Sequence, residues 1–106
     1  MKRNKLIICV STDDQERRRL IQRVAIKLGF ALTPGDANKL IQNSPRDFDL
    51  SEAYFVIAHT YNLNESPHTT HQLYRLAVQG VAVIIGVKKL QPQYEQMCEV
   101  YNQGEI

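Results

Sequence analysis

The sequence predicts an α/β protein: a small single domain, residues 1–106, in which a four-stranded parallel sheet is covered by helices on both faces. Three observations support this fold class. Short apolar runs rich in β-branched residues recur along the chain, as in strands buried on both faces. Amphipathic segments with helical spacing separate them. Their alternation is typical of βαβ units with right-handed crossovers, as in Rossmann-like and flavodoxin-like three-layer sandwiches.

The first predicted unit is a strand at Leu6–Val10 followed by a long helix. Thr12 opens the sequence Thr-Asp-Asp-Gln, which matches a capping box. Gly29 is expected to end the helix. The inner face of the helix repeats at helical spacing and consists of Leu20, Ile21, Val24, Ala25 and Leu28. Ile26 falls on the opposite, charged side, either as a lone exposed hydrophobe or as part of a second contact surface.

Phe30–Leu32 is predicted as a short second strand, with a turn at Pro34 and Gly35. Asp36 is expected to cap a short helix after this turn. The third predicted strand is Tyr54–His59, which is again apolar and β-branched.

The second half continues the alternation. Ser66 is a predicted N-cap, with Pro67 at the first helical position. Val81–Val87 is the fourth predicted strand, and Pro92 is expected to start a final helix. The apolar face of that helix would be Tyr94, Met97, Cys98 and Tyr101. We predict the strand order 2-1-3-4.

Composition excludes several classes of protein. No run approaches the roughly 18 apolar residues of a membrane span, and the basic start is too short for a secretory signal. We therefore expect a cytoplasmic protein that does not contact a membrane. Cys9 and Cys98 lie in apolar surroundings and are expected to be reduced.

Charge is uneven along the chain. The first 30 residues carry eight Lys/Arg against three Asp/Glu, and the remainder carries five against eight. The basic set on the first helix is Arg17, Arg18, Arg19, Arg23 and Lys27. These residues form either a solvated helix face or a phosphate or nucleic-acid footprint. Nucleic acid is the less favoured partner, because no aromatic residues interleave with the charges.

Polar residues follow the predicted strands, and parallel strands bring such residues to one edge of the sheet. The predicted ligand-binding residues are Ser11, Thr12, Pro34, Gly35, His59, Ser66, Thr69 and Thr70. Lys88 and Lys89 would follow the fourth strand at the same edge. Helix N-termini there favour a phosphate or another anion. No GxGxxG or GxxxxGK[ST] motif is present, so a Rossmann dinucleotide site and a P-loop are disfavoured.

Three histidines gather at this predicted edge. His59 ends a strand, and His68 and His71 are three residues apart on one helix. They are solvated or capping side chains, a general acid/base or phosphate contact, or zinc ligands. We expect no metal and no cofactor. Asp13 and Asp14 could be a paired-carboxylate site, but their place in a first turn favours a role at the helix dipole.

The order of elements resembles the nucleoside 2-deoxyribosyltransferase-like family. The matching segments are LIICVST, QERRRLIQRVAIKLGF, ALTPGD, YFVIAHT, SPHTT, HQLYRLAVQG and VAVIIGV. The resemblance implies a Rossmann-like fold and a nucleotide-like ligand. Gln72 stands at the position of the family's nucleophilic glutamate, and an amide cannot form a glycosyl ester as a carboxylate does. His68, His71 and Gln72 are therefore the candidate catalytic residues.

A receiver domain is a second resemblance. Asp13-Asp14 and the following helix are similar to a receiver's acidic pair and first helix, and Lys88 is similar to its lysine near a late strand end. The third strand ends in Ala58-His59-Thr60 and offers no phosphoacceptor aspartate. This resemblance implies a partner-binding version of that fold without phosphotransfer.

Two functions of different classes follow. The first is a module that binds a nucleotide, nucleoside or related phosphorylated ligand, with weak or no catalysis. The second is a non-enzymatic regulatory or protein-interaction domain, either a homodimer or a partner of another protein, with Ile26, the Arg-rich helix and Tyr94/Tyr101 at the contact. Nucleic-acid binding through the first helix is a third, weaker option, with a steep salt dependence.

Overall fold

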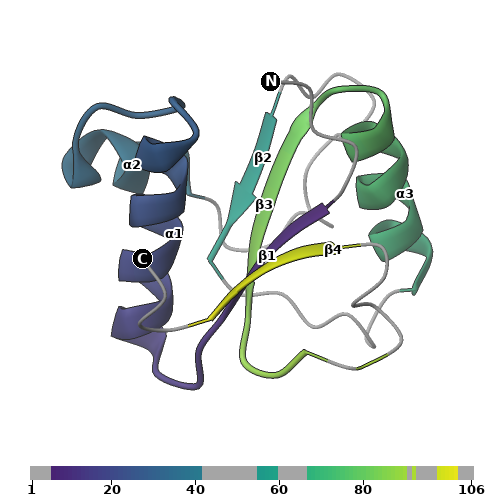
Figure 1. Cartoon of the computed structure of the whole chain (residues 1–106), viewed down its shortest axis with the longest axis horizontal. Helices are drawn as coiled ribbons and strands as arrows, with labels where there is room; N and C mark the ends of the chain where they lie inside the picture. The colour runs from purple at the N-terminus through teal and green to yellow at the C-terminus, as the bar shows by residue number, and fades with distance from the viewer. Residues whose placement is uncertain (1–5, 42–54, 60–66, 91, 93–97, 103–106) are drawn as a thin grey trace.

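The computed structural model describes residues 6–41, 55–59, 67–90, 92 and 98–102, and it has the predicted α/β class (Figure 1). Strands and helices alternate along most of the described chain. In chain order the elements are β1 (Leu6–Val10), α1 (Asp14–Lys27), α2 (Pro34–Leu40), β2 (Phe55–Ala58), α3 (Pro67–Val78), β3 (Ala82–Val87) and β4 (Cys98–Asn102).

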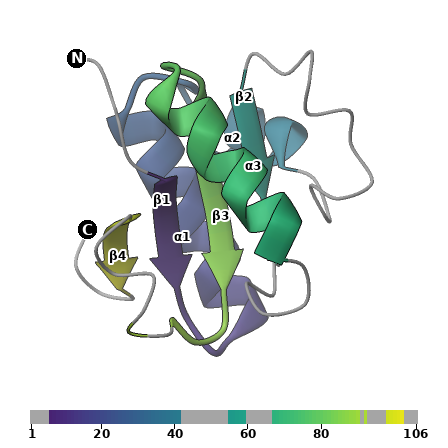
Figure 2. The ribbon, with the colours of Figure 1, turned by 90° about the vertical axis from the view of Figure 1, so that its right-hand side faces the viewer.

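All paired strands run parallel, in the order β2-β3-β1-β4. The register pairs Val10 with Val87 and, on the other side, with Asn102. Helices α1 and α2 lie on one face of the sheet and α3 lies on the other, as the two perpendicular views show (Figures 1 and 2). The prediction of a parallel sheet with helices on both faces is confirmed.

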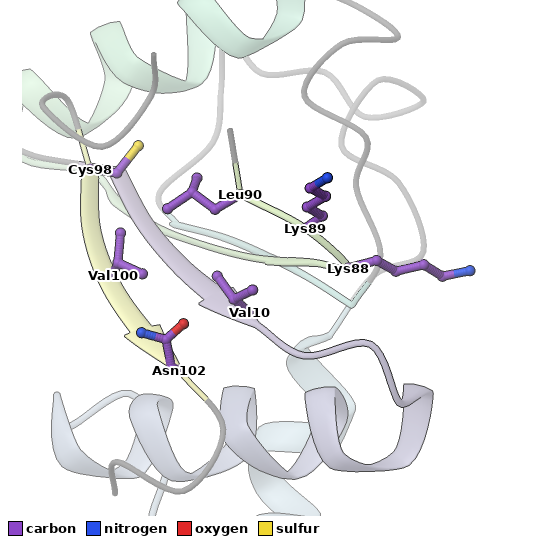
Figure 3. A pocket seen from close by; sticks show the side chains of 7 residues that line it. All are labelled: Val10, Lys88, Lys89, Leu90, Cys98, Val100 and Asn102. Carbon is purple, nitrogen blue, oxygen red and sulfur yellow. The ribbon is translucent and has the colours of Figure 1, made fainter. Parts of the chain in front are cut away.

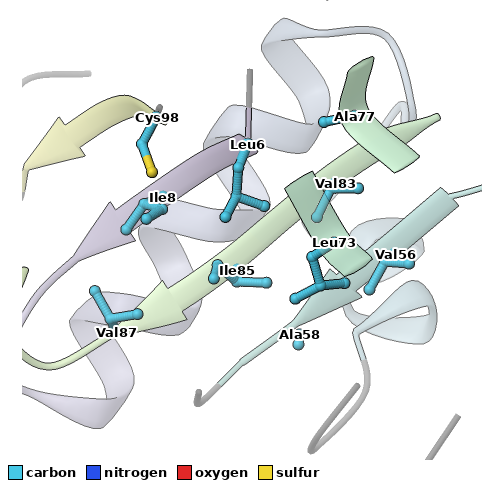
Figure 4. Packing of buried hydrophobic residues seen from close by; sticks show 10 residues of the cluster. All are labelled: Leu6, Ile8, Val56, Ala58, Leu73, Ala77, Val83, Ile85, Val87 and Cys98. Atoms are coloured by element: carbon cyan, nitrogen blue, oxygen red, sulfur yellow. The ribbon is translucent and has the colours of Figure 1, made fainter. Parts of the chain in front are cut away.

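The core consists of two layers, because successive strand residues point to opposite faces. Between the sheet and α3 lies a cluster that includes Ile8, Leu73 and Ile85 (Figure 4). Between the sheet and α1 lies a second cluster that includes Ile21 and Ile84. Burial on both faces explains why the strands read as continuous apolar runs rather than as alternating patterns.

The two long helices end in the same way. Gly29 has φ +86° and Gly80 has φ +98°, and both follow the last helical turn. The N–H groups of Gly29 and Phe30 donate back to the carbonyls of Ile26 and Ala25, which is the Schellman pattern. The predicted end of the first helix at Gly29 is confirmed.

The predicted second strand, Phe30–Leu32, is wrong. These residues connect α1 to α2 without pairing to a strand. The Schellman turn uses Phe30, and Thr33 is already the N-cap of α2, its Oγ1 accepting from the Asp36 N–H at 3.1 Å. Too few residues remain between these two caps to form a strand. Thr33, not Asp36, therefore caps this helix, with Pro34 at its first position.

The predicted final helix is also wrong where the structure describes it, because Cys98–Asn102 forms β4. The spacing of Cys98 and Tyr101 fits a helix, but Cys98 and Val100 also alternate with Glu99 and Tyr101 at strand period. Pairing with the open side of β1 along five residue pairs decides between the two patterns. With one predicted strand absent and this one added, the strand order 2-1-3-4 is replaced by β2-β3-β1-β4.

Three side chains correct or confirm smaller expectations. Ile26 packs against the cluster under α1, so it is not a lone exposed hydrophobe. Cys9 and Cys98 are buried free thiols on opposite faces of the sheet, as expected of reduced cysteines. Within the described part of the chain, no helix has the length and apolar character needed to cross a bilayer.

Candidate functional site

The carboxyl ends of β1, β2 and β3 lie at one edge of the sheet, because the strands are parallel and in register. Ser11, His59 and Lys88 are the first residues beyond these three ends. The chain leaving β1 enters α1 on one face, whereas Leu90, three residues beyond β3, packs against the cluster on the α3 face. The connections therefore diverge between β1 and β3, and ligands of open α/β sheets bind at such a switch point.

A fully buried arginine organises this edge. Arg17 is 0% exposed. Its Nη1 donates to the Ser11 carbonyl at 3.0 Å and its Nε donates to the His59 carbonyl at 3.0 Å. Nη2 pairs with the carboxylate of Asp14. A single guanidinium thus joins the ends of β1 and β2 to the first turn of α1.

The arginine fits because β3 has a glycine beneath it. A Cβ on Gly86 would lie 2.3 Å from the His59 carbonyl oxygen, 2.7 Å from Ile21 Cδ1 and 3.0 Å from Arg17 Cγ. The first of these is a backbone atom and cannot move away alone. Gly86 therefore leaves space on β3 for the Arg17 side chain, which reaches from there to the residues that follow β1 and β2.

The carboxylate of Asp14 is surrounded by the positively charged or polar groups of this edge. The hydrogen bond from Arg17, and then the charges of Arg17, Lys88 and His59, lower the pKa of the Asp14 carboxyl. The Nε2 of His59 lies 2.9 Å from the backbone carbonyl oxygen of Asp14. An ionised, arginine-paired carboxylate is a weak base near neutral pH, so Asp14 is poorly suited to general acid/base chemistry.

The N-terminus of α1 is capped by the side chain of an aspartate that precedes the helix. Asp13, not Thr12 as the capping-box match predicted, is the N-cap, and its Oδ1 accepts from the Glu16 N–H at 2.9 Å. Asp14 and Glu16 add negative charge to the same turn. These carboxylates occupy the positive end of the dipole and repel a second anion. The expectation of a phosphate at this helix end is therefore weakened.

A hollow lies on the α3 face of the same edge. It has a volume of about 650 Å³ and is lined by the end of β1, by β4 and by the segment after β3 (Figure 3). Its lining residues are Val10, Lys88, Lys89, Leu90, Cys98, Val100 and Asn102. Three of these side chains are aliphatic, one is a thiol, and the remaining three are cationic or amide groups. The volume lies within the roughly 300–1,000 Å³ of small-ligand pockets.

The predicted site residues divide into three groups. Ser11, Thr12 and His59 lie at the carboxyl edge as predicted. Ser11 is 4% exposed, and its Oγ accepts a hydrogen bond from the backbone nitrogen of Asp13 at 3.3 Å. Its hydroxyl therefore stabilises the turn between β1 and α1. Thr12 is exposed. His59 is half-buried and its carbonyl is used by Arg17.

The helix α3 carries the second group. Thr70 is 2% exposed, so its hydroxyl does not present a surface to a ligand. His71 and Gln72 are exposed on the first half of the helix. Ser66 and the side chains of His68 and Thr69 lie outside the described residues. The predicted grouping of histidines is thus described only for His59 and His71.

Pro34 and Gly35 are the third group, and their prediction as edge residues is wrong. They begin α2, which follows the end of α1 farther from the strand ends. The 14 residues of α1 span about 21 Å at the usual rise of a helix, enough to return past the sheet. Figure 1 shows α2 beside that far part of α1. Because Phe30–Leu32 is not a strand, nothing brings these residues to the carboxyl edge.

Sequence reasoning missed Arg17, Gly86 and Asn102. Arg17 was assigned to a basic helix face, although its spacing of four from Ile21 continues the buried stripe. A glycine inside the apolar run of β3 is a signal of close approach by another group. Asn102 could not be found because its segment was predicted as a helix.

The described residues contain no cluster of three His, Cys, Asp or Glu side chains placed to hold a metal ion. Comparisons with protein-family models, curated proteins and solved structures gave no match for this chain.

Proposed function

We propose that this protein binds a small phosphorylated ligand, a nucleotide or a related nucleoside phosphate, at the carboxyl edge of the sheet, with little or no catalysis. The hollow is the observation that carries this proposal. It lies beside the switch point between β1 and β3, and its lining combines three aliphatic side chains with two lysines. Pockets of small ligands combine apolar surface with a few polar groups that orient the ligand.

The charges at this edge support an anionic ligand. Lys88 and Lys89 follow β3 and are exposed. In Figure 3 the side chain of Lys88 extends away from the other lining residues, and its charge acts on Asp14. We therefore assign the acidic group of the ligand to Lys89, on the side of the hollow away from the acidic first turn of α1.

Weak catalysis follows from the groups available. Asp14 is tied to Arg17, which lowers the pKa of its carboxyl away from neutrality. Gln72 is exposed on α3 and, as an amide, is no substitute for a nucleophilic carboxylate. Neither residue therefore supplies a general acid/base or a nucleophile. Binding a ligand requires neither group, so binding without catalysis is the simpler function for this edge.

A thermal-unfolding panel tests the proposal. The protein is heated alone and with nucleoside monophosphates, the matching nucleosides and inorganic phosphate. A ligand present at 100 times its Kd should raise the free energy of unfolding by about 2.7 kcal/mol. Lys89→Gln should reduce the shift, whereas Lys39→Gln, an exposed lysine on α2, should leave it unchanged. Absence of any shift across the panel would contradict the proposal.

A second function is favoured by a separate observation. Leu32 is 90% exposed and Phe30 is 40% exposed, both on the connection between α1 and α2. Two neighbouring exposed hydrophobic side chains suit a contact with another protein or a second copy of this chain. Light scattering of the wild type and Leu32→Ser tests this alternative. If both the wild type and Leu32→Ser are monomers and neither captures a partner protein, this second function is wrong.

A further inference from the structure

We infer that β4 forms a wall of the hollow that opens separately from the rest of the sheet, and that Lys27 and Tyr101 hold this wall closed from the opposite face. The β4 wall consists of the three lining residues on that strand, Cys98, Val100 and Asn102. For the ligand, the inference rests on the proposed function, because a molecule that occupies the hollow needs the wall in place. The contact between Lys27 and Tyr101 can be tested without any ligand.

β4 contributes side chains to both faces of the sheet. Figure 3 shows the side chains of the β4 wall along the strand, at the hollow. Successive residues of a strand point to opposite faces, so Glu99 and Tyr101 lie on the face away from the hollow. Cys98 belongs to the cluster under α3, whereas Tyr101 packs against the cluster under α1. A contact between Tyr101 and α1 therefore positions the wall through the backbone of β4.

Of the four strands that the structure describes, β4 is the least buried. It is buried only at Cys98, whereas β1, β2 and β3 each bury all but one of their residues. Within the described sheet, β4 stands at one end of the strand order and pairs with β1. Segments with little buried surface open locally at a lower free-energy cost than the core does. β4 is therefore the strand expected to open first.

Lys27 joins α1 to β4 through an aromatic ring. Its Nζ lies 5.3 Å from the centroid of the Tyr101 ring, within the roughly 6 Å of a cation–π interaction. The Tyr101 hydroxyl donates to Glu99 Oε1 at 3.0 Å, which orients the ring on its own strand. A cation–π contact of an exposed lysine changes an equilibrium constant by roughly two- to fivefold. Loss of this contact should raise the open fraction of β4 by the same factor.

A ligand in the hollow should close the wall further. Because the β4 wall is part of the surface that the ligand contacts, the ligand binds the closed form better than the open form. The closed form is then favoured by the factor 1 + [L]/Kd. At ten times its Kd, a ligand should reduce the open fraction of β4 about elevenfold.

Native-state amide hydrogen exchange of the full chain measures the opening of β4. In the wild type, the β4 amides that pair with β1 should exchange at least about tenfold faster than the β3 amides, with a weaker dependence on urea. Equal protection and equal urea dependence of the two strands would mean that β4 opens only when the whole fold does, and the inference would be wrong.

The first comparison removes the lysine. Lys27→Gln should speed exchange of the β4 amides two- to fivefold, whereas Lys27→Arg, which keeps the cation, should stay close to the wild type. The matched control is Lys39→Gln, because Lys39 is an exposed lysine in the last turn of α2, as Lys27 is in α1. The control should leave β4 exchange unchanged. An effect of Lys27→Gln no larger than that of the control would contradict the inference.

Tyr101→Leu separates the ring contact from the effect of Lys27 on its own helix. A cation in the last turn of α1 also stabilises the helix through the dipole. In the Tyr101→Leu background only this second effect is lost, so Lys27→Gln should change β4 exchange less than it does in the wild type. Equal effects in the two backgrounds would show that Lys27 does not act through Tyr101, which would overturn the inference.

The last measurement adds adenosine monophosphate and, separately, each other nucleoside monophosphate of the thermal panel at ten times its Kd. A compound that binds should slow β4 exchange about elevenfold. If a compound binds and β4 exchange does not change, β4 is not a wall of the binding site and the inference is wrong, while ligand binding stands. If nothing in the panel binds, the proposed function is wrong, and a Lys27→Gln effect that depends on Tyr101 still supports the inference.

Discussion

Arg17 shows how a single side chain decides the geometry of the carboxyl edge. An arginine in the interior is tolerated only when its donors are used, and here they reach two backbone carbonyls and a carboxylate. Because the carbonyls belong to residues beyond β1 and β2, the guanidinium fixes how these two strand ends sit on either side of β3. Lys88, just beyond the end of β3, acts by its charge on the Asp14 carboxylate that pairs with this arginine.

Replacing Arg17 should be strongly destabilising. In Arg17→Met, two backbone carbonyls lose a charged donor, and each such hydrogen bond is worth roughly 1.5–3 kcal/mol, so we expect a loss of about 3 kcal/mol or more. Urea unfolding measures the change. Arg19→Met removes an exposed pair with Glu16 and should cost no more than about 0.5 kcal/mol. Equal losses for the two variants would show that Arg17 is not held as described.

Asp14 provides a test of the charge arrangement at the same edge. Its pKa should lie below the ordinary value of 3.8, first because Arg17 donates to the carboxylate and then because Arg17, Lys88 and His59 are positive or polar neighbours. Since the folded value is below the unfolded value, ionised Asp14 stabilises the fold above the ordinary pKa, and this contribution is lost as pH falls through the lowered value. A carboxyl-detected NMR titration should find the lowered pKa, and Lys88→Gln should raise it slightly. A value at or above 3.8 in the wild type would contradict the pairing.

Cys9 should be chemically silent in the folded chain. Burial raises the pKa of its thiol to about 12, from 9.0. The raised value means that stability is unaffected below pH 9 and declines as the pH rises above it, because the unfolded thiol ionises first. In a Cys98→Ala background, a thiol reagent at pH 8 should modify the protein only after unfolding. Rapid modification of the native variant would show that β1 opens readily.

At the scale of elements, β3 is one of the two central strands of the sheet, because it pairs with both β1 and β2. Gly86 on this strand leaves no room for a Cβ. Gly86→Ala would place a Cβ 2.3 Å from the carbonyl oxygen of His59, so the change should cost at least about 1–3 kcal/mol, the usual range for overpacking.

Gly35→Ala is the matched control for this substitution. Gly35 lies in the first turn of α2, where a Cβ would meet only Thr33 Oγ1 at 3.8 Å. Because alanine favours a helix more than glycine does, this variant should be neutral or gain up to about 1 kcal/mol. Thermal or urea unfolding of both variants measures the contrast. If Gly86→Ala were as stable as the control, the close packing of Arg17 over β3 would be wrong.

The elements differ in how well the sequence alone predicts them. β1 and β3 are buried on both faces, and their continuous apolar runs leave little alternative. Gly29 marks a helix end because only glycine adopts its backbone conformation without strain. The segment of β4 is predicted as a helix because the spacing of Cys98 and Tyr101 fits that period. The alternation of Cys98 and Val100 with Glu99 and Tyr101 fits a strand as well, and only pairing with β1 chooses between the two. Phe30–Leu32 is predicted as a strand because its three residues are apolar. The C-terminal cap of α1 and the N-cap of α2 flank this segment and leave too few residues to pair with a strand.

At the scale of the whole molecule, parallel pairing is what brings distant residues to one edge. Ser11, His59 and Lys88 are separated by tens of residues in the chain, and register alone places them together. That part of the site follows from the predicted fold class. The hollow does not, because three of its seven lining residues come from β4 and none of its lining residues was among the predicted ligand-binding set.

The most direct test of ligand binding at the carboxyl edge is an amide NMR titration of the protein with adenosine monophosphate and, separately, the other three nucleoside monophosphates. Binding in the hollow predicts saturable shifts at Val10, Lys89 and Asn102 for at least one ligand, with little change at Ala37 in α2, which lies on the other face. Saturable shifts centred on α2, or no shift with any of the four ligands at millimolar concentration, would contradict it.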